Sequence, residues 1–336
     1  MRVAIVTNMT SQKGLWRDGL ILERALIAAG HEPQLVDWRD TEAPARWRGA
    51  FDAILFCEVI EPGLYPLVKQ DGLYLRKVNP EWEIPNKIEE TTRRFDVVLC
   101  KTVDAYRLGP WKDKAHVMGF ESEDVGEGDF PGRGAPQFLH PCGGSIARGT
   151  LPVLEAWRLA VEHGQIPPAS KLHVVDPPDT RYVQTAIAGC PGIVVANRLP
   201  EHRLRELQRH CAVHVIPSEY EGWGHLFWEA LSTGALVIGT DGPWWQEARG
   251  AYEAIPSRPG HHRNLAPLRH VEVGALRTAL AAAAHRPPLF VPQARARFLA
   301  RRAAFRARLP RLLERLWPSS STVTPALFIP TPTVSA

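Results

Sequence analysis

Apolar and polar positions fall into blocks along the chain, and the first blocks predict a strand, a helix and a second strand. Residues 2–7 are mostly apolar and are typical of a buried first strand. Between 15 and 29, apolar residues recur at helical spacing, and Gly30 supplies a glycine cap at the end of that helix. Residues 32–36 predict the second strand. The chain therefore opens as a strand–helix–strand unit.

The rest of the first half continues this pattern as far as a polar segment. Further apolar blocks predict strands at 51–57, 95–101 and 116–120. The stretch 61–85 contains four prolines and predicts irregular chain. Residues 121–136 are rich in glycine and acidic side chains and contain almost nothing apolar. We therefore place a first domain at 1–125 and an interdomain linker at 126–136.

The second half alternates in the same way. The predicted strands are 138–140, 172–175, 193–196, 212–216 and 235–240, and the predicted helices are 150–163, 204–209, 226–232, 271–284 and 294–317. Repeated strand–helix units indicate a parallel sheet covered on both faces. We expect a second domain at 137–290 and a basic helix at 291–318 that packs back across the domains. A Ser/Thr/Pro-rich tail at 319–336 is expected to be disordered.

Two carboxylates bracket a loop that joins a strand to a helix in the second half. The strand-like run 212–216 ends just before the loop, and the helix-like run 226–232 follows it. Glu221 and Glu229 lie on either side of this junction, and glycines lie between them. In a parallel sheet, such a junction is at the carboxyl end of a strand, where ligands bind.

This string resembles the Glu-(seven residues)-Glu motif of retaining, nucleotide-sugar-dependent glycosyltransferases of the GT-B fold, known as glycosyl transferases group 1. The usual pattern is Pro-Ser-x-x-Glu-Gly-Phe-Gly-x-x-x-x-Glu-Ala. The positions that fill it here are Pro217, Ser218, Glu221, Gly222, Trp223 in place of phenylalanine, Gly224, Glu229 and Ala230. Gly234, Val237, Ile238, Thr240 and Asp241 match its usual continuation.

The resemblance implies an α/β GT-B fold, in which two Rossmann-like, doubly wound parallel-sheet domains face a central cleft. It implies that the second domain binds a nucleoside-diphosphate sugar and that the first domain binds an acceptor. The implied activity is that of a retaining hexosyltransferase, which needs neither a metal ion nor another cofactor. The chain contains no Asp-x-Asp triplet, which agrees with a metal-independent reaction.

A glycine-rich loop at 143–150 joins another predicted strand to a helix. At such a loop, backbone amides near Gly144 and Ser145 and the helix N-terminus can approach phosphate oxygens. Arg148 adds a fixed cation with a fork of donors. The family usually has an arginine where this chain has Ser145 and a lysine where it has Arg148. The resemblance therefore implies that Arg148 neutralises the leaving diphosphate, with one of the two usual cations missing.

The motif itself implies the remaining donor contacts. Glu229 is expected to accept hydrogen bonds from ribose hydroxyls, as a carboxylate can from a cis-diol. Glu221 is expected to lie beside the transferred sugar and to act with Arg148 as a catalytic residue. The loop residues expected to reach the sugar, the phosphates or the nucleobase are Gly222, Gly224, His225, Leu226, Arg198 and Leu199.

Polar residues at strand ends of the first half are the candidates for the acceptor side. These residues are Lys13, Gly14, Glu58 and Lys101. The segment 79–83 offers aromatic and acidic groups of the kind that bind sugars, or else forms a packed surface loop. The sequence does not identify the acceptor, which could be a glycan, a lipid, a small molecule or a nucleic-acid base.

Composition narrows the range of functions. A chain of 336 residues suits two domains, and a net charge of +4 suits an anionic ligand without arguing for nucleic acid by itself. Five scattered cysteines form no Cys-x-x-Cys pair. No apolar run approaches the roughly 20 residues that span a bilayer, so we expect a cytoplasmic protein.

Two alternatives to a glycosyltransferase stay open. One is a nucleotide-sugar epimerase on the same fold, and the other is a non-catalytic GT-B protein that binds a glycan or nucleic acid. The missing cation at Ser145 and the eight arginines of the helix at 294–317 favour the second alternative. Those arginines are either solvated on a packed helix or in peripheral contact with an anionic membrane surface or nucleic acid.

Overall fold

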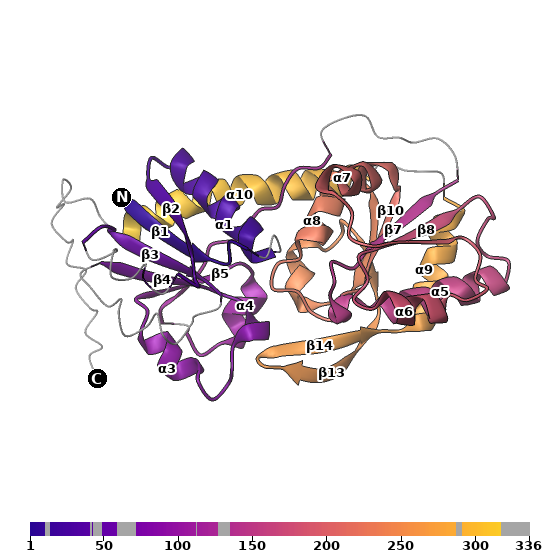
Figure 1. Ribbon diagram of the computed structural model, residues 1–336, viewed down its shortest axis with the longest axis horizontal. Helices are drawn as coiled ribbons and strands as arrows, with labels where there is room; N and C mark the ends of the chain where they lie inside the picture. Colours follow the sequence, from indigo (N-terminus) through magenta and orange to yellow (C-terminus); the bar gives the residue numbers. More distant parts are fainter. Residues whose placement is uncertain are drawn as a thin grey trace, which may run out of the picture.

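The computed structural model describes residues 1–10, 14–40, 42, 49–58, 72–111, 113–126, 135–286 and 291–316. These residues form two six-stranded parallel sheets, one in each half of the chain, with helices packed around them (Figure 1). The expected α/β architecture is confirmed. Most of the expected linker and all of the expected tail lie outside the described residues.

The first sheet has the strand order β2-β1-β3-β4-β5-β6, and all neighbouring strands are parallel. Ile5 and Leu55 pack in a core on one face of the sheet, and Ala4 and Ile54 pack in a separate core on the other. Burial on both faces explains the nearly continuous apolar runs. The elements are β1 (Arg2–Thr7), α1 (Gly14–Ala28), β2 (Glu32–Asp37), β3 (Ala53–Cys57), β4 (Leu73–Val78), α3 (Ile88–Arg93), β5 (Val97–Cys100), α4 (Val103–Leu108) and β6 (Ala115–Val117).

Strand β4 corrects one expectation. The stretch 61–85 was expected to be irregular, yet it contains a fully buried strand between β3 and β5. Two charged residues interrupt the apolar run of β4 and hide its pattern. Arg76 pairs with Glu83 at 2.7 Å, and Lys77 pairs with Glu58 at 2.9 Å. Because buried charges are stable only when they are paired, these partners allow the strand to lie at this central position.

The second sheet has the strand order β12-β11-β10-β7-β8-β9, again with parallel neighbours. Its central strands β7 and β10 contribute Leu139 and Val215, which are 0% exposed. The strands are β7 (Gln137–Pro141), β8 (Lys171–Val175), β9 (Ile193–Ala196), β10 (Val213–Ile216), β11 (Leu236–Thr240) and β12 (Glu253–Ile255). The helices are α5 (Thr150–Glu162), α6 (Thr180–Ala186), α7 (Glu201–His210), α8 (His225–Ser232) and α9 (Val273–Ala284).

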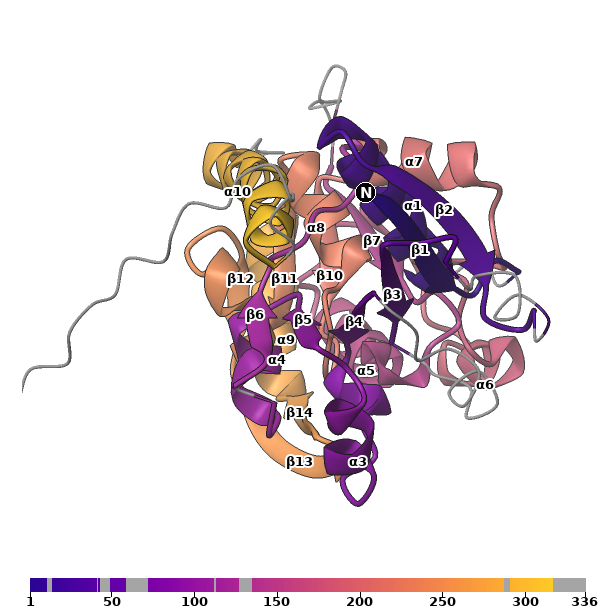
Figure 2. The same cartoon turned by 90° about the vertical axis from the view of Figure 1, so that its left-hand side faces the viewer.

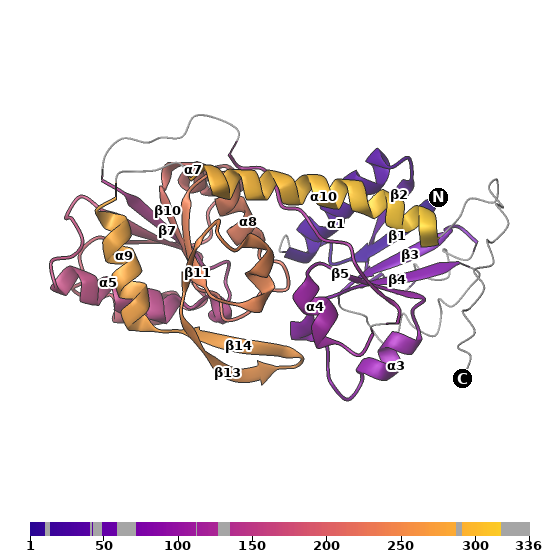
Figure 3. The ribbon, with the colours of Figure 1, turned by 180° about the vertical axis from the view of Figure 1, so that it is seen from behind.

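An antiparallel hairpin in the second half was not predicted from the sequence. It consists of β13 (Ser257–Arg263) and β14 (Ala266–Val271), and it extends toward the first half (Figures 1 and 3). Strand β13 has no buried residue, so it lacks the apolar alternation that signals a strand. The turn of the hairpin contacts the first half, where the N–H of Leu265 donates to the carbonyl of Pro80 at 3.2 Å.

Helix α10 (Pro292–Leu316) runs from the second half across to the first (Figure 3) and lies against α8 (Figure 2). Its buried Phe298 and Phe305 belong to the same continuous core as Ile5 of β1 and Trp228 of α8. Its arginines reach acidic partners as well, and Arg306 donates to Glu121 at 2.7 Å. Helix α10 therefore ties the two halves together. No helix among the described residues is both long enough and apolar enough to cross a membrane.

Candidate active site

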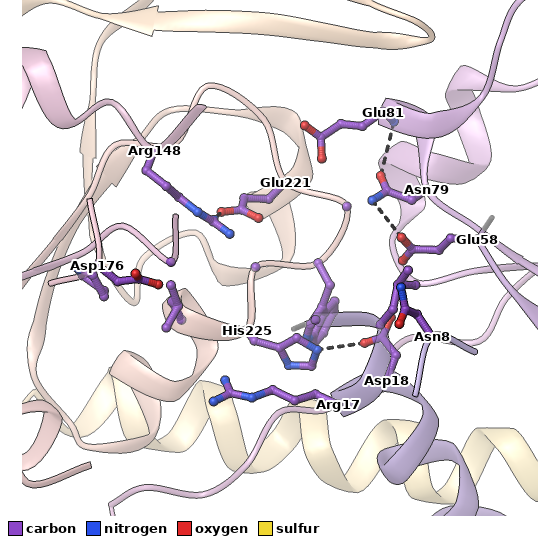
Figure 4. A pocket seen from close by; sticks show the side chains of 18 of the residues that line it. Asn8, Arg17, Asp18, Glu58, Asn79, Glu81, Arg148, Asp176, Glu221 and His225 are labelled. Atoms are coloured by element: carbon purple, nitrogen blue, oxygen red, sulfur yellow. Dashed lines mark hydrogen bonds and ion pairs between the residues drawn. The ribbon is translucent and has the colours of Figure 1, made fainter. Parts of the chain in front are cut away.

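A cavity of about 560 Å³ lies between the two halves (Figure 4). Residues that directly follow strands of both sheets line it, which is where parallel sheets bind ligands. The first half contributes Asn8, Gly14, Leu15, Arg17, Asp18, Trp38, Glu58, Asn79, Glu81, Trp82 and Lys101. The second half contributes Pro141, Gly143, Arg148, Val175, Asp176, Arg198, Leu199, Glu201, Leu204, Glu221, Gly222, Trp223, Gly224, His225 and Leu226.

Arg148 and Glu221 form an ion pair on the wall of the second half. Arg148 ends a short 3₁₀ helix, η3 (Ile146–Arg148), and its side chain also donates to the hydroxyl of Ser218 at 3.3 Å. Ser218 in turn donates to Glu221 at 2.8 Å. Gly149 fixes this arrangement, because it has φ 67° and a Cβ there would lie 2.4 Å from the carbonyl of Pro217. The ion pair thus depends on a glycine that no other residue can replace without strain.

The loop after Glu221 approaches the first half very closely. A Cβ on Gly222 would lie 2.5 Å from the side-chain oxygen of Asn79. Gly224 has φ 80° and is the N-cap of α8, and the first residues of α8, His225 and Leu226, line the cavity. Since the first N–H groups of a helix have no partner within it, this turn offers donors and partial positive charge to an anionic ligand.

Four buried charged residues form a cluster at the first-half wall, and all of them except Lys77 line the cavity. Lys101 bonds to Asp18 at 3.0 Å and to Glu58 at 2.9 Å, and Lys77 pairs with the same two carboxylates. Burial alone would raise the pKa of Asp18, but Lys101 and Lys77 hold that pKa well below its usual value. Burial opposes the same lysines at Glu58, whose pKa is also lowered. Both carboxylates are therefore ionised at neutral pH.

His225 connects this cluster to the second half. Its Nε2 lies 2.8 Å from Asp18, and its Nδ1 lies 2.9 Å from the hydroxyl of Ser122 (Figure 4 shows the contact with Asp18). The indole N–H of Trp223 donates to the same hydroxyl at 2.9 Å. Because both ring nitrogens are engaged, His225 holds the start of α8 against α1. This geometry gives it a positioning role.

Two residues on the cavity wall have an uncommon backbone conformation. Glu58, directly after β3, has φ 64°, and Asp176, directly after β8, has φ 54°. Residues other than glycine rarely adopt such angles, and those that do are concentrated at functional sites. Each half of the chain therefore contributes one such position to the cavity wall.

Glu229 lies beside the cavity but not on its wall. Its carboxylate is 0% exposed, and both of its oxygens are engaged. Arg17 of α1 binds Oε1 at 3.0 Å, whereas Gln208 and Arg205 of α7 approach Oε2 at 2.9 and 3.1 Å. Arg17 also bonds to Glu201 at 3.0 Å. Arg17, which lines the cavity, therefore stands between Glu229 and any ligand in it.

The comparison with known proteins identifies the fold. No family model and no curated protein matches the sequence. Among solved structures, a glycosyltransferase from Rickettsia africae has a TM-score of 0.68 at 15% identity, over 94% of this chain and 96% of that one. The apo form of the lipopolysaccharide outer core galactosyltransferase WaaB has a TM-score of 0.64 at 12% identity, over 94% and 100% of the two chains. Anabaena Alr3699/HepE, in complex with UDP and glucose, has a TM-score of 0.59 at 12% identity, over 94% and 99%.

The chain has the GT-B fold. Two parallel sheets with a cavity between their carboxyl ends match the expected architecture, and that prediction is confirmed.

In this GT-B structure, most of the expected site residues meet in one place. Those on the cavity wall are Gly14, Glu58, Lys101, Arg148, Arg198, Leu199, Glu221, Gly222, Gly224, His225 and Leu226. Gly144 and Ser145 are not on the wall. The N–H of Gly144 donates to the carbonyl of Asp176 at 2.7 Å, and the hydroxyl of Ser145 caps η3 by accepting from the N–H of Ala147. Lys13 lies outside the described residues.

Sequence reasoning missed several residues of the GT-B cavity. Arg17 and Asp18 belong to the amphipathic helix α1, and a polar residue on such a helix gives no signal of its own. Asp176 directly follows β8, so its position at a strand end was an available signal. The segment 79–83 was expected either to bind sugars or to form a packed surface loop. Three of its residues, Asn79, Glu81 and Trp82, line the cavity.

Proposed function

We propose that this chain is a retaining glycosyltransferase that moves a hexosyl group from a nucleoside-diphosphate sugar to an acceptor hydroxyl. In this proposal, residues 137–290 bind the donor, residues 1–125 bind the acceptor, and residues 291–318 hold the two parts together. The observation that carries the proposal is the meeting of Arg148, Glu221 and the first turn of α8 on one cavity wall. A fold neighbour in complex with UDP and glucose supports it.

The leaving diphosphate accounts for the cationic part of the site. As the bond between the anomeric carbon and the diphosphate oxygen breaks, negative charge develops on the diphosphate. Arg148 and the N–H groups at the start of α8 supply positive charge at that point. In the proposed reaction, these groups stabilise the charge on the diphosphate without a metal ion. Arg148 exchanges part of its contact with Glu221 for the phosphate.

The transferred sugar accounts for Glu221. The acceptor oxygen bonds to the anomeric carbon on the face that the diphosphate leaves, and its proton passes to a diphosphate oxygen. This sequence retains the anomeric configuration and balances the proton. In this proposal, Glu221 binds sugar hydroxyls and stabilises positive charge on the ring. The hydrogen bond from Ser218 to the carboxylate of Glu221 supports this role, because it orients the carboxylate.

Glu229 takes the ribose hydroxyls in this proposal. Since Arg17 holds Glu229 in the structure, the donor displaces Arg17 from this carboxylate. Arg205 and Gln208 remain in place and orient the carboxylate toward the ribose.

The test is a panel of UDP-, GDP- and ADP-sugars with NMR detection of the products. The expected result is release of a nucleoside diphosphate from at least one donor, with the sugar first formed in the donor's anomeric configuration. Glu221→Gln is expected to lower turnover by roughly a hundredfold or more. Glu219→Gln is the matched control, because Glu219 belongs to the same loop but pairs with His270 away from the cavity. Conversion of every donor into an isomeric nucleotide sugar, or release that is unchanged in Glu221→Gln, would refute the proposal.

A further inference from the structure

The first-half wall of the cavity contains a surface with aromatic and polar side chains that faces the loop proposed to bind the donor. It is formed by Asn79 at the end of β4 and by the 3₁₀ helix η2 (Pro80–Trp82). Figure 4 shows Asn79 and Glu81 across the cavity from Glu221 and Arg148. The side chain of Asn79 donates to Glu58 at 3.3 Å and accepts from the N–H of Glu81 at 3.3 Å. These bonds fix the orientation of the amide and leave part of its hydrogen-bonding capacity for a ligand.

Trp82 is unusual among the tryptophans in the part of the chain that the structure describes. It is 58% exposed, whereas Trp111, Trp157, Trp228, Trp244 and Trp245 are each exposed by 2% or less. An exposed indole on a cavity wall offers a large flat apolar face beside polar groups. The apolar face of a pyranose ring fits such a surface, and its hydroxyls then reach the neighbouring side chains.

The charges on this wall are unsuited to a phosphorylated acceptor. Among the described residues of the first half that line the cavity, the cations are Arg17 and Lys101. Lys101 is paired with two buried carboxylates, and Arg17 still pairs with Glu201 once the donor displaces it from Glu229. Glu81 adds a further carboxylate to the wall, and Arg263 contacts it at 3.3 Å. Phosphate recognition uses cations that are available to the ligand. An acceptor phosphate here would instead meet carboxylates at close range.

The hairpin holds this surface in place. Arg263 of β13 pairs with the side chain of Glu81, and the amide of Asn264 donates to its backbone carbonyl. The N–H of Leu265 donates to Pro80. The hairpin belongs to the second half, so the part that binds the donor also fixes the surface that would meet the acceptor. Such support from a second layer of residues is what a binding site needs.

We propose that the acceptor is an uncharged carbohydrate whose ring stacks on Trp82 and whose hydroxyls bond to Asn79 and Glu81. This inference rests on the proposed function and specifies its acceptor. The sugar would lie between Trp82 and the anomeric carbon of the donor, so one of its hydroxyls is the nucleophile.

Saturation-transfer NMR with simple sugars tests this inference. The probes are the methyl glycosides of glucose, galactose, mannose and N-acetylglucosamine, together with glucose 6-phosphate. Each is measured with and without a saturating concentration of UDP, GDP or ADP, whichever the wild type binds. At least one methyl glycoside is expected to bind, and to bind more tightly than glucose 6-phosphate. Trp82→Ala is expected to weaken that binding at least tenfold, and Trp82→Phe is expected to restore most of it.

Ile84→Ala is the control, because Ile84 is 47% exposed near the same segment but does not line the cavity. The thermal midpoint of Trp82→Ala shows that the variant is folded. Tighter binding of glucose 6-phosphate, absence of glycoside binding, or equal binding by wild type and Trp82→Ala would overturn the inference. Failure of wild type to bind any of UDP, GDP and ADP would instead count against the proposed function, so the two failures are distinguishable.

Discussion

Replacing Arg17 by alanine is expected to tighten the binding of a nucleoside diphosphate. Arg17 is part of α1 in the first half, and it binds Glu229 and Glu201 of the second half at 3.0 Å each. If Glu229 receives the ribose, this bridge must open before the donor can bind. If only molecules with an open bridge can bind, the apparent affinity is the affinity of the open form multiplied by the fraction of molecules that are open.

The expected gain in affinity depends on how exposed the three side chains of the bridge are. Glu229 is 0% exposed, Arg17 is 22% exposed and Glu201 is 59% exposed. The bridge therefore lies between an exposed ion pair, worth about 0–1 kcal/mol, and a buried one, whose loss costs about 3–5 kcal/mol. A value of about 1–2 kcal/mol corresponds to a roughly 5- to 30-fold gain in affinity when Arg17 is removed. Arg205 and Gln208 still bind Glu229 in the variant.

Calorimetric titration with UDP measures this gain. Arg24→Ala is the matched control, because Arg24 is on the same helix and is 58% exposed beside Glu123. The account predicts tighter binding by Arg17→Ala and wild-type binding by Arg24→Ala. Equal binding by Arg17→Ala would show that the bridge does not compete with the nucleotide. Weaker binding would show that Arg17 itself contacts the nucleotide, and the reasoning would be wrong.

Three further predictions concern stability and are measured by urea denaturation. Lys77→Met leaves two buried carboxylates with a single lysine, so the free energy of unfolding is expected to fall by about 3–5 kcal/mol; a loss below about 1 kcal/mol would contradict this. Burial lowers the pKa of His214 to about 4, below the usual value near 6.5. Between those pH values the unfolded chain therefore binds more protons than the folded chain, so the free energy of unfolding should fall as the pH falls. The expected loss from this residue is about 2 kcal/mol at pH 5. An unchanged pH dependence of stability in a His214→Asn variant would refute this. Gly149→Ala and Gly164→Ala share nearly the same backbone angle (φ 67° and 66°), but only the first places a Cβ against a backbone carbonyl. The first is expected to cost at least about 2 kcal/mol more than the second, and equal costs would show that the loop relaxes freely.

Most strands that were easy to recognise in the sequence are buried on both faces, almost entirely by apolar residues. Strands β1, β3 and β10 are of this kind, and a run of apolar residues identifies each. Strand β4 was missed because Arg76 and Lys77 find buried partners that are distant along the chain. The hairpin was missed because its first strand, β13, has no buried residue. Its contacts with the other half are made by backbone groups and charges, which leave no apolar pattern.

The same distinction applies to the site. Arg148 and Glu221 belong to short strings with a fixed spacing, so sequence alone singled them out. The partners of Glu229 are separated from it in the chain, and Arg17 lies 212 positions away. A single sequence carries no trace of such a pairing, because only the fold brings α1 beside α8. The surface proposed to bind the acceptor could not be recognised from the sequence for the same reason. The exposure of Trp82 on it is a property of the folded chain.

The most direct test of the central claim compares nucleotide binding by wild type, Arg148→Met and Arg158→Met. Arg148 belongs to the loop that follows β7, whereas Arg158 lies on the next helix, α5, and pairs with Glu162 at the surface. Calorimetry with UDP, GDP and ADP is expected to show that wild type and Arg158→Met bind at least one of them. Arg148→Met is expected to bind that nucleotide roughly 10- to 100-fold more weakly, as the loss of a charged hydrogen bond implies. Equal affinities for the two variants, or no binding of any nucleoside diphosphate by wild type, would contradict the account.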